Sequence, residues 1–333
     1  MTNEERTLFW KTLSSFNGEQ VDLESKVLGE VLKYPHYLYR FRAVSNSTLD
    51  GLRTNRLYFS TADKYDDPFD TFLYIDWDNI INEMRNAFEN DLHKQTAFTF
   101  IQKSLGFTQE SISNFFTQHS TDEWINFGKH IMTITRDNLQ KNQLSICFSE
   151  DALNETLWLK YAQNHTGFTL AYDLTDESAI ICGKKDTCNA CPSRDFKFPI
   201  YPIYYSDNQY DATEYTKFLA MQELIYKLPP NISNSIPKVF PNMTWQRERI
   251  SLIKHKCHEY DKEWRMINPQ LLNSTSKASR PFIVWRPSYI ILGLRIGNTE
   301  KNLVLSLAKE AGINKIYQCV INHHNKLDLV LFN

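Results

Sequence analysis

The chain has 333 residues, 42% of them apolar and 23% charged, and its net charge at pH 7 is −2. This is the composition of an ordinary globular protein, and the near-zero charge excludes a chain that binds nucleic acid through an overall basic surface. No apolar stretch is long enough to predict a transmembrane helix, and the polar start at residues 1–6 lacks the features of a signal peptide. We therefore expect a cytoplasmic protein without membrane association, whose six cysteines are reduced thiols.

Glycine is scarce, with 10 residues in the chain, and the glycine-dependent motifs of common enzyme classes are absent from the sequence. It has no G-x-G-x-x-G dinucleotide fingerprint, no phosphate-binding P-loop, no H-E-x-x-H zinc motif and no G-x-S-x-G nucleophile elbow. These absences disfavour classical Rossmann, P-loop, zincin and α/β-hydrolase chemistry.

The first part of the chain begins with helices and continues with strands. Residues 1–34 predict a helical N-terminal segment, because apolar residues recur there at helical spacing until a proline ends the pattern. Residues 37–44 predict a strand, followed by a short helix, and residues 57–60 predict a second strand. The loop after it contains D-D-P-F-D at residues 66–70, which is typical of a structured turn.

Residues 76–142 predict a helical insertion, because they carry two apolar stripes at helical spacing. A Cys-rich loop follows at residues 182–195. The other expected elements are strands at 143–150, 167–173, 200–205 and 262–267, helices at 156–162, 211–228 and 243–258, and a strand, helix, strand and strand over 281–332. Because strands occur along the chain while helices gather in insertions, the sequence predicts one α+β domain over residues 35–333.

Three predicted strands carry polar residues beside aromatic ones. They contain Tyr39-Arg40, then Phe148-Ser149 leading into a helix with Trp158 and Tyr161, and lastly Asp261-Lys262-Glu263-Trp264-Arg265. In the last of these, the strand period of two places Asp261, Glu263 and Arg265 on one face.

Each of these motifs also has a purely structural interpretation. Arg40 fits an exposed strand arginine. Trp158 and Tyr161, at i,i+3 spacing, fit a core stripe of a helix. Asp261 and Glu263 fit surface ion pairs with neighbouring basic residues.

Taken in order, the motifs resemble those of a large bacterial family, the domain of unknown function 2971 family. That family has a Tyr-[Arg/Lys] strand, a Phe-Ser turn into Asn-Asp-Pro-Phe-Asp, then Cys-Phe-Ser, Trp-x-x-Tyr-Ala-x-x-His-x-Gly and Glu-x-Glu-Trp-Arg. The matching segments here are Tyr39-Arg40, residues 57–60, 67–70 and 147–149, the segment from Trp158 to Gly167, and residues 263–265. Asp66 and Asp261 replace the family's usual Asn and first Glu.

The order of the motifs is also similar to that of ADP-ribosyltransferases. In that superfamily an early strand carries Arg or His, a middle strand carries a polar–aromatic–polar element, and a late strand carries the catalytic Glu. The resemblance implies a core of two packed, mostly antiparallel sheets and an enzyme that uses NAD as its substrate. The residues it implies in NAD binding are Tyr39, Arg40, Phe148, Trp158, Tyr161 and Arg265.

The chemistry of NAD gives these residues their expected roles. A guanidinium such as that of Arg40 would hold the pyrophosphate, and aromatic faces would stack on the cationic nicotinamide. Glu263 would stabilise the oxocarbenium-like transition state through the ribose hydroxyl. Ser149 would orient Glu263, and Asp261 would position the acceptor nucleophile. Arg265 would either pair with Glu263 or bind phosphate.

At the level of the family, the expected function is that of an intracellular bacterial toxin or antiphage effector. It would modify a macromolecule, either protein or nucleic acid, under the control of an antitoxin or regulatory protein. Two other functions remain open. One is a metal-dependent hydrolase or nuclease that uses Asp66, Asp67, Asp70 and Glu263 around Mg²⁺ or Mn²⁺. The other is a non-catalytic nucleotide-sensing module.

The Cys-rich loop predicts a structural zinc site. Cys188 and Cys191 form a C-x-x-C half-site, and Cys182 lies shortly before it. A fourth ligand would come from residues 255–258, which contain two histidines and a cysteine, to complete a closed tetrahedral site. The alternative is three unrelated thiols in a loop.

Overall fold

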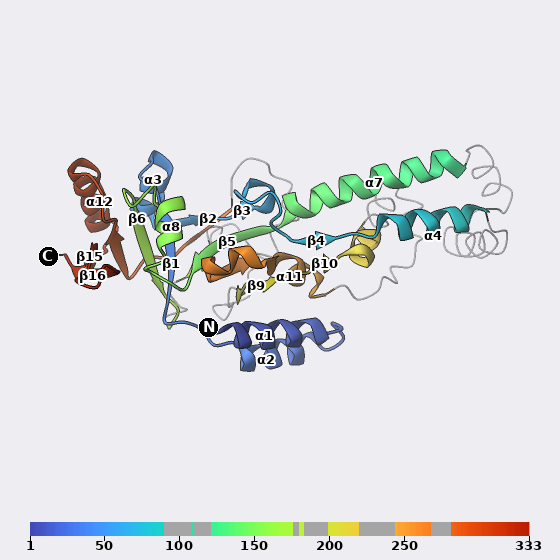
Figure 1. Ribbon diagram of the computed structural model, residues 1–333, viewed down its shortest axis with the longest axis horizontal. Coiled ribbons are helices and arrows are strands. Elements are labelled where there is room, and N and C mark those ends of the chain that lie inside the picture. Colours follow the sequence, from blue (N-terminus) through green and yellow to red (C-terminus); the bar gives the residue numbers. More distant parts are fainter. Residues whose placement is uncertain are drawn as a thin grey trace.

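The computed structural model describes residues 1–89, 108, 121–175, 180–182, 199–219, 244–267 and 281–332. Over these residues the chain is an α+β protein, as the sequence predicts, with a large mixed sheet and helices packed around it (Figure 1). None of the helices in this part of the chain is long and apolar enough to cross a membrane.

Over the described ranges the large sheet has nine strands, and its neighbouring strands are antiparallel except for β14 and β15. Its path runs β16-β15-β14-β6-β1-β5-β12-β8, and β3 pairs with β5 beside this path. The strands are β1 (Tyr37–Arg42), β3 (Ser60–Thr61), β5 (Leu144–Ser149), β6 (Phe168–Asp173), β8 (Ile200–Pro202), β12 (Glu263–Ile267), β14 (Tyr289–Leu292), β15 (Ile316–Ile321) and β16 (Leu327–Leu331).

Three small sheets accompany it within the described residues. They are formed by β2 (Arg56–Tyr58), β13 (Phe282–Val284) and β7 (Ile181–Cys182), by β4 (Leu73–Tyr74) with β10 (Tyr210–Asp211), and by β9 (Tyr204–Ser206) with β11 (Ile253–His255). Leu57 and Ile283 of the three-stranded sheet share one hydrophobic core with Ile146 and Trp264 of the large sheet. Where the sequence predicts two packed sheets, the described residues form one large sheet and three small ones.

Strand β12 shows how the sequence gives the large sheet two different faces. Alternate side chains of a strand point to opposite faces, so Trp264 and Met266 enter the apolar core while Glu263 and Arg265 point to the other side. All five residues of β12 are nevertheless buried. The strand therefore holds two charged side chains below the protein surface, where each needs a partner.

Helices α1 (Asn3–Ser15) and α2 (Val21–Val31) confirm that the N-terminal segment is helical, and α1 begins with a capping box. Arg6 of α1 is buried, and its Nη1 donates hydrogen bonds of 2.9 Å to the carbonyl oxygens of Ile203 and Glu263. The segment therefore fixes the backbone at the start of β12.

Helices α4 (Trp77–Glu89) and α7 (Thr121–Asn142) form the described parts of the predicted helical insertion. They lie side by side and project from one end of the molecule (Figure 1). Ile80 and Met132, one from each helix, belong to the same small hydrophobic cluster. Both helices thus bury apolar faces against each other, as the predicted stripes require.

Residues 243–258 differ from the helix that the sequence predicts there. Helix α11 (Gln246–Ser251) is short, and β11 and the 3₁₀ helix η3 (Lys256–Asp261) follow it. Strand β11 pairs in parallel with β9, which supplies the buried backbone with hydrogen bonds that a longer helix would otherwise have made. The correction matters because β11 carries Lys254 into the interior.

Further helices are α3 (Asn46–Thr54), η1 (Ala62–Lys64), α8 (Glu155–Lys160) and α12 (Asn298–Glu310), and residues 213–219 are also helical. Helix α12 completes the predicted C-terminal order of strand, helix, strand and strand. Two glycines allow close backbone approach near α8. A Cβ on Gly167 would lie 2.1 Å from the carbonyl oxygen of Arg42, and one on Gly293 would lie 2.2 Å from that of His165. Any larger residue at either position would push these segments apart.

Candidate functional site

A cavity of about 250 Å³ opens where β1 and β5 part from one another. Strand β1 pairs along its full length with β6 but meets β5 at a single pair, Tyr39 with Ser149. Further along, β5 pairs with β3 instead. The cavity is lined from β1, β5 and β12, from the loop after β3, from α8, and from β11 and η3.

Eight of the nine residues predicted for NAD chemistry line this cavity. They are Tyr39, Arg40, Phe148, Ser149, Tyr161, Asp261, Glu263 and Arg265. Three of them lie in one row across adjacent strands, since Ser149 is paired with Tyr39 on one side and with Glu263 on the other. Segments far apart in the sequence therefore meet at one place.

Trp158 is the exception, and it does not line the cavity. Its side chain has no exposed surface, lies edge-on to Phe41, and stacks on His165 with a centroid distance of 5.7 Å. Its indole nitrogen donates to the carbonyl oxygen of Ala152 at 2.9 Å. The structural interpretation of Trp158 as a core residue is therefore right, and Tyr161 is the aromatic residue of this helix region that reaches the cavity.

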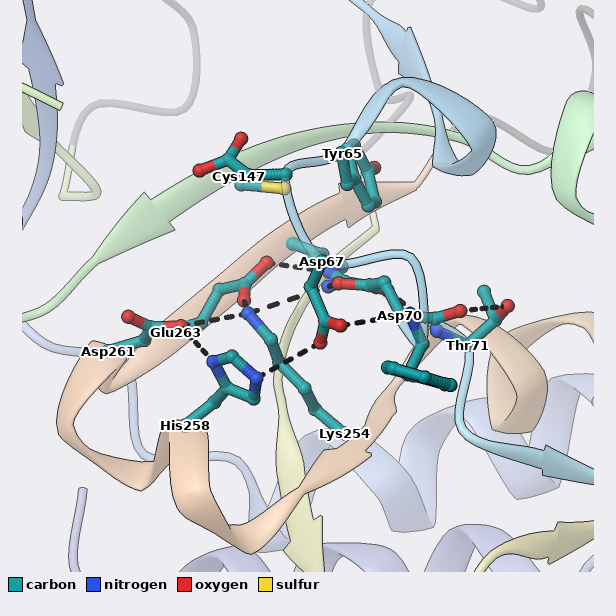
Figure 2. A network of polar contacts seen from close by, with 12 residues as sticks. Tyr65, Asp67, Asp70, Thr71, Cys147, Lys254, His258, Asp261 and Glu263 are labelled. Carbon is teal, nitrogen blue, oxygen red and sulfur yellow. Dashed lines mark hydrogen bonds and ion pairs between the residues drawn. The ribbon is translucent and has the colours of Figure 1, made fainter. Parts of the chain in front are cut away.

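Glu263 is held by two cations. Oε1 accepts a hydrogen bond of 2.7 Å from Nε of Arg265, and Oε2 accepts one of 3.0 Å from Nζ of Lys254 (Figure 2). Burial alone would raise the pKa of Glu263, but the charges of Arg265 and Lys254 outweigh it and hold the pKa well below its ordinary value. Glu263 is therefore a carboxylate at neutral pH, with a fixed orientation.

Arg265 is committed to protein partners. Its Nη1 and Nη2 bind the two carboxylate oxygens of Asp70 at 2.8 and 2.6 Å, and Nη1 also donates to the carbonyl oxygen of Ser251 at 2.8 Å. This is the bidentate geometry that a guanidinium favours. Of the two roles expected for Arg265, the structure shows pairing with Glu263. Because the guanidinium also binds Asp70 and Ser251, we no longer expect it to bind a ligand phosphate.

Ser149 and Asp261 are linked, although not through Glu263 as the sequence-based role of Ser149 requires. The hydroxyl of Ser149 donates to the carbonyl oxygen of Asp261 at 2.8 Å. Ser149 thus fixes the backbone just before β12 rather than the Glu263 side chain. Oδ2 of Asp261 accepts from Nζ of Lys254 at 2.8 Å, and burial raises the pKa of Asp261 although Lys254 opposes it.

Lys254 and His258 lie at this site although the sequence analysis gave neither a role in it, and considered His258 only as a possible zinc ligand. Both fall in the segment predicted to be one helix, which gave no reason to expect their side chains beside Glu263. Lys254 bridges Asp261 and Glu263 and lies 3.9 Å from Oδ2 of Asp70. Nε2 of His258 lies 3.1 Å from Oδ2 of Asp67 (Figure 2). The third motif offered one signal: it brings the carboxylates of Asp261 and Glu263 close together, and two such carboxylates need a cation nearby if they are buried.

The turn at residues 67–70 is structured, as predicted, and it also supplies charge to the site. The backbone N–H groups of Phe69 and Asp70 bond to the side chain and the carbonyl oxygen of Asp67. Asp70 is 2% exposed and meets Arg265. Asp70 and Glu263, expected as metal ligands in the hydrolase hypothesis, are thus each bound to protein cations.

The predicted zinc site stays a prediction. Cys188 and Cys191 lie outside the described residues, and for Cys182 only the backbone is described. In the segment that would supply the fourth ligand, Cys257 is exposed and His258 pairs with Asp67. Among the residues that the structure describes, no group of three or more His, Cys, Asp or Glu side chains is arranged to hold a metal ion.

Comparison with known proteins adds no relative: no family model, curated protein or solved structure matches this chain. The site must therefore be interpreted from its own residues. It combines an ionised, oriented carboxylate and a histidine–aspartate pair, and Arg40 and Arg42 of β1 also belong to the lining of the cavity.

Proposed function

We propose that this protein is an NAD-dependent ADP-ribosyltransferase. The observation that carries the proposal is the convergence of Tyr39 and Arg40, Ser149, and Glu263 on one cavity, in the order along the chain that the resemblance implies. The α+β architecture is compatible with an ADP-ribosyltransferase-like core, in which two sheets part around the NAD site. The divergence of β1 and β5 supports this proposal.

The electrostatics of the site suit a substrate that is cationic at one end and anionic at the other. With all five residues ionised, Asp70, Asp261 and Glu263 against Lys254 and Arg265 leave one net negative charge at the base of the cavity. This charge favours the nicotinamide cation and the oxocarbenium-like state that follows its departure.

Basic residues stand at another part of the cavity lining. Arg40 and Arg42 of β1 and Lys160, the last residue of α8, contribute to it. A pyrophosphate bound there would leave the nicotinamide riboside to enter toward Glu263. The aromatic ring of Tyr161, over which Nζ of Lys160 lies at 5.3 Å from the centroid, offers a face for stacking.

Glu263 keeps the capacity to bind the ribose. A carboxylate has about four acceptor sites, of which Arg265, Lys254 and the thiol of Cys147 use three. The 2′-hydroxyl of the ribose can therefore donate to Glu263 without displacing either cation. Because both cations fix the carboxylate beforehand, little reorganisation is needed when positive charge develops on the sugar.

The biological role follows from the resemblance and extends the proposal. The protein would be an intracellular bacterial toxin or antiphage effector, acting on a protein or nucleic acid and restrained by an antitoxin or regulator. The macromolecular acceptor would enter the cavity toward Asp261, which lines it together with Glu263.

The test is to incubate the purified chain with NAD labelled in the nicotinamide ring and to measure release of nicotinamide, with and without EDTA. We expect release in both conditions. A protein that leaves NAD intact but cleaves a phosphodiester or another bond only with Mg²⁺ or Mn²⁺ would instead support the hydrolase hypothesis. Tight NAD binding without release would support the sensing module.

A further inference from the structure

His258 of η3 has one ring nitrogen paired and the other unpaired. Nε2 lies 3.1 Å from Oδ2 of Asp67, whereas Nδ1 is buried and has no hydrogen-bond partner among the residues that the structure describes. The imidazole lies between Asp67 and Asp261, and its Nδ1 is 3.9 Å from Oδ2 of Asp261 (Figure 2). That separation is too long for a direct hydrogen bond. Oδ1 of Asp261 is likewise buried, with no hydrogen-bond partner in the described part of the chain.

The pairing with Asp67 determines what Nδ1 can do. A carboxylate that accepts the proton of Nε2 fixes the neutral tautomer in which Nδ1 carries the lone pair. The same carboxylate stabilises the imidazolium once Nδ1 has taken up a proton. Asp67, His258 and Asp261 all line the cavity that also contains Glu263.

We infer that His258 is the proton acceptor for a hydroxyl nucleophile, water or an alcohol, that attacks the ribose of NAD in this cavity. The inference rests on the proposed function and deepens it by naming the class of acceptor. Asp261 is the less suitable base, because its Oδ2 already accepts a hydrogen bond from Lys254. When water is the nucleophile, its second O–H can donate to Oδ1 of Asp261, which has no hydrogen-bond partner among the described residues.

The step balances as follows. A bond forms between the nucleophile oxygen and the anomeric carbon of the nicotinamide riboside. The bond from that carbon to the nicotinamide nitrogen breaks, and its electron pair neutralises the pyridinium ring. The hydroxyl proton moves to Nδ1 of His258, which later releases it to solvent. A carboxylate acceptor would have no such proton to lose and would not need His258.

The experiment uses NAD with water as the nucleophile and follows nicotinamide release by the full chain. For His258→Ala we expect a fall in rate of about 10²-fold or more with NAD affinity retained, and partial recovery of the rate when imidazole is added. For Glu263→Gln, imidazole should restore nothing. A structural role of His258 alone would not produce rescue by a free base.

His36 supplies the matched control, because its Nε2 also pairs with an aspartate, Oδ2 of Asp173 at 3.3 Å, and it does not line the cavity. His36→Ala should keep the wild-type rate. If His258→Ala does not fold, His258→Gln, which retains hydrogen-bonding capacity, should show the same loss of rate.

The outcomes separate the two proposals. Wild-type protein that releases no nicotinamide would overturn the proposed function and this inference with it. If the wild-type protein is active, a wild-type rate in the His258 variants or a lack of rescue by imidazole would overturn this inference alone.

Discussion

The side chains of Glu263 and Arg265 lie on the same face of β12, and Nε of Arg265 donates a hydrogen bond of 2.7 Å to Oε1 of Glu263. The other end of the guanidinium binds both oxygens of Asp70. A chain of charged contacts thus runs from the turn at residues 67–70 through β12 to the cavity. These contacts orient the carboxylate of Glu263 and keep it ionised.

Removing the charge of Glu263 should affect catalysis more than binding. Glu263→Gln keeps the shape of the side chain but loses the charge that opposes the developing oxocarbenium, so kcat should fall by about 10²-fold or more. The affinity for NAD, measured by titration calorimetry, should change only a few-fold. The control is Glu24→Gln, a buried carboxylate that accepts from Nε1 of Trp245 at 2.8 Å and does not line the cavity. Equal effects of the two variants on kcat would contradict the assigned role.

Arg40→Ala should show the opposite pattern. A phosphate contact is similar in the ground state and the transition state, so its loss should raise KM for NAD by about tenfold or more and leave kcat within a few-fold. Steady-state kinetics of nicotinamide release provide the measurement. Arg53→Ala, on the surface of α3 and away from the cavity, is the control. A drop in kcat at unchanged KM would show that Arg40 does not bind the phosphates.

The pair of Asp70 and Arg265 should be important for stability. Both are buried, and removing one partner leaves a charge without compensation, so Asp70→Asn should lower the free energy of unfolding by about 3–5 kcal/mol. Urea denaturation measures this difference. The matched control is Asp50→Asn, which breaks an exposed pair with Arg53 and should cost less than about 1 kcal/mol. Similar losses of unfolding free energy in both variants would show that the buried pair contributes no more to stability than the exposed one.

The lowered pKa of Glu263 predicts how stability depends on acid. Because the folded-state pKa lies below the ordinary value of 4.5, the stabilisation from ionised Glu263 is present above that value and is lost as pH falls toward the folded-state pKa. The stability difference between wild type and Glu263→Gln should therefore shrink between about pH 5 and about pH 3. Denaturant titrations at several pH values test this. A difference that stays constant or grows on acidification would contradict it.

Cys147 should be a poor nucleophile although it lines the cavity. Burial and the negative charges of Glu263 and Asp70 raise its pKa to about 12, although Arg265 opposes them. At neutral pH the thiol stays protonated, and the thiolate is the species that reacts. Peptide mass spectrometry after brief treatment with iodoacetamide should find Cys257, which is exposed, modified well before Cys147. Modification of Cys147 at the same rate as Cys257 would show that the thiol is activated.

The local features of this protein can be predicted from its sequence. Apolar periodicity predicted the N-terminal helices, the helical insertion and the C-terminal strand–helix–strand order, because these patterns depend only on neighbours along the chain. The strand period also placed Glu263 and Arg265 on one face before any contact was known, but Asp261, which the same prediction included, belongs to η3 and not to the strand. Such features follow from backbone geometry and need no knowledge of distant segments.

The tertiary structure alone decided which residues share the site. Lys254 enters it because β11 pairs with β9, which overrides the helix predicted for that segment. Trp158 does not line the cavity, because its ring packs between Phe41 and His165 in the core. His258 meets Asp67 only when η3 folds against the turn at residues 67–70. These outcomes depend on contacts between segments far apart in the chain, where burial and ion pairing outweigh local propensity.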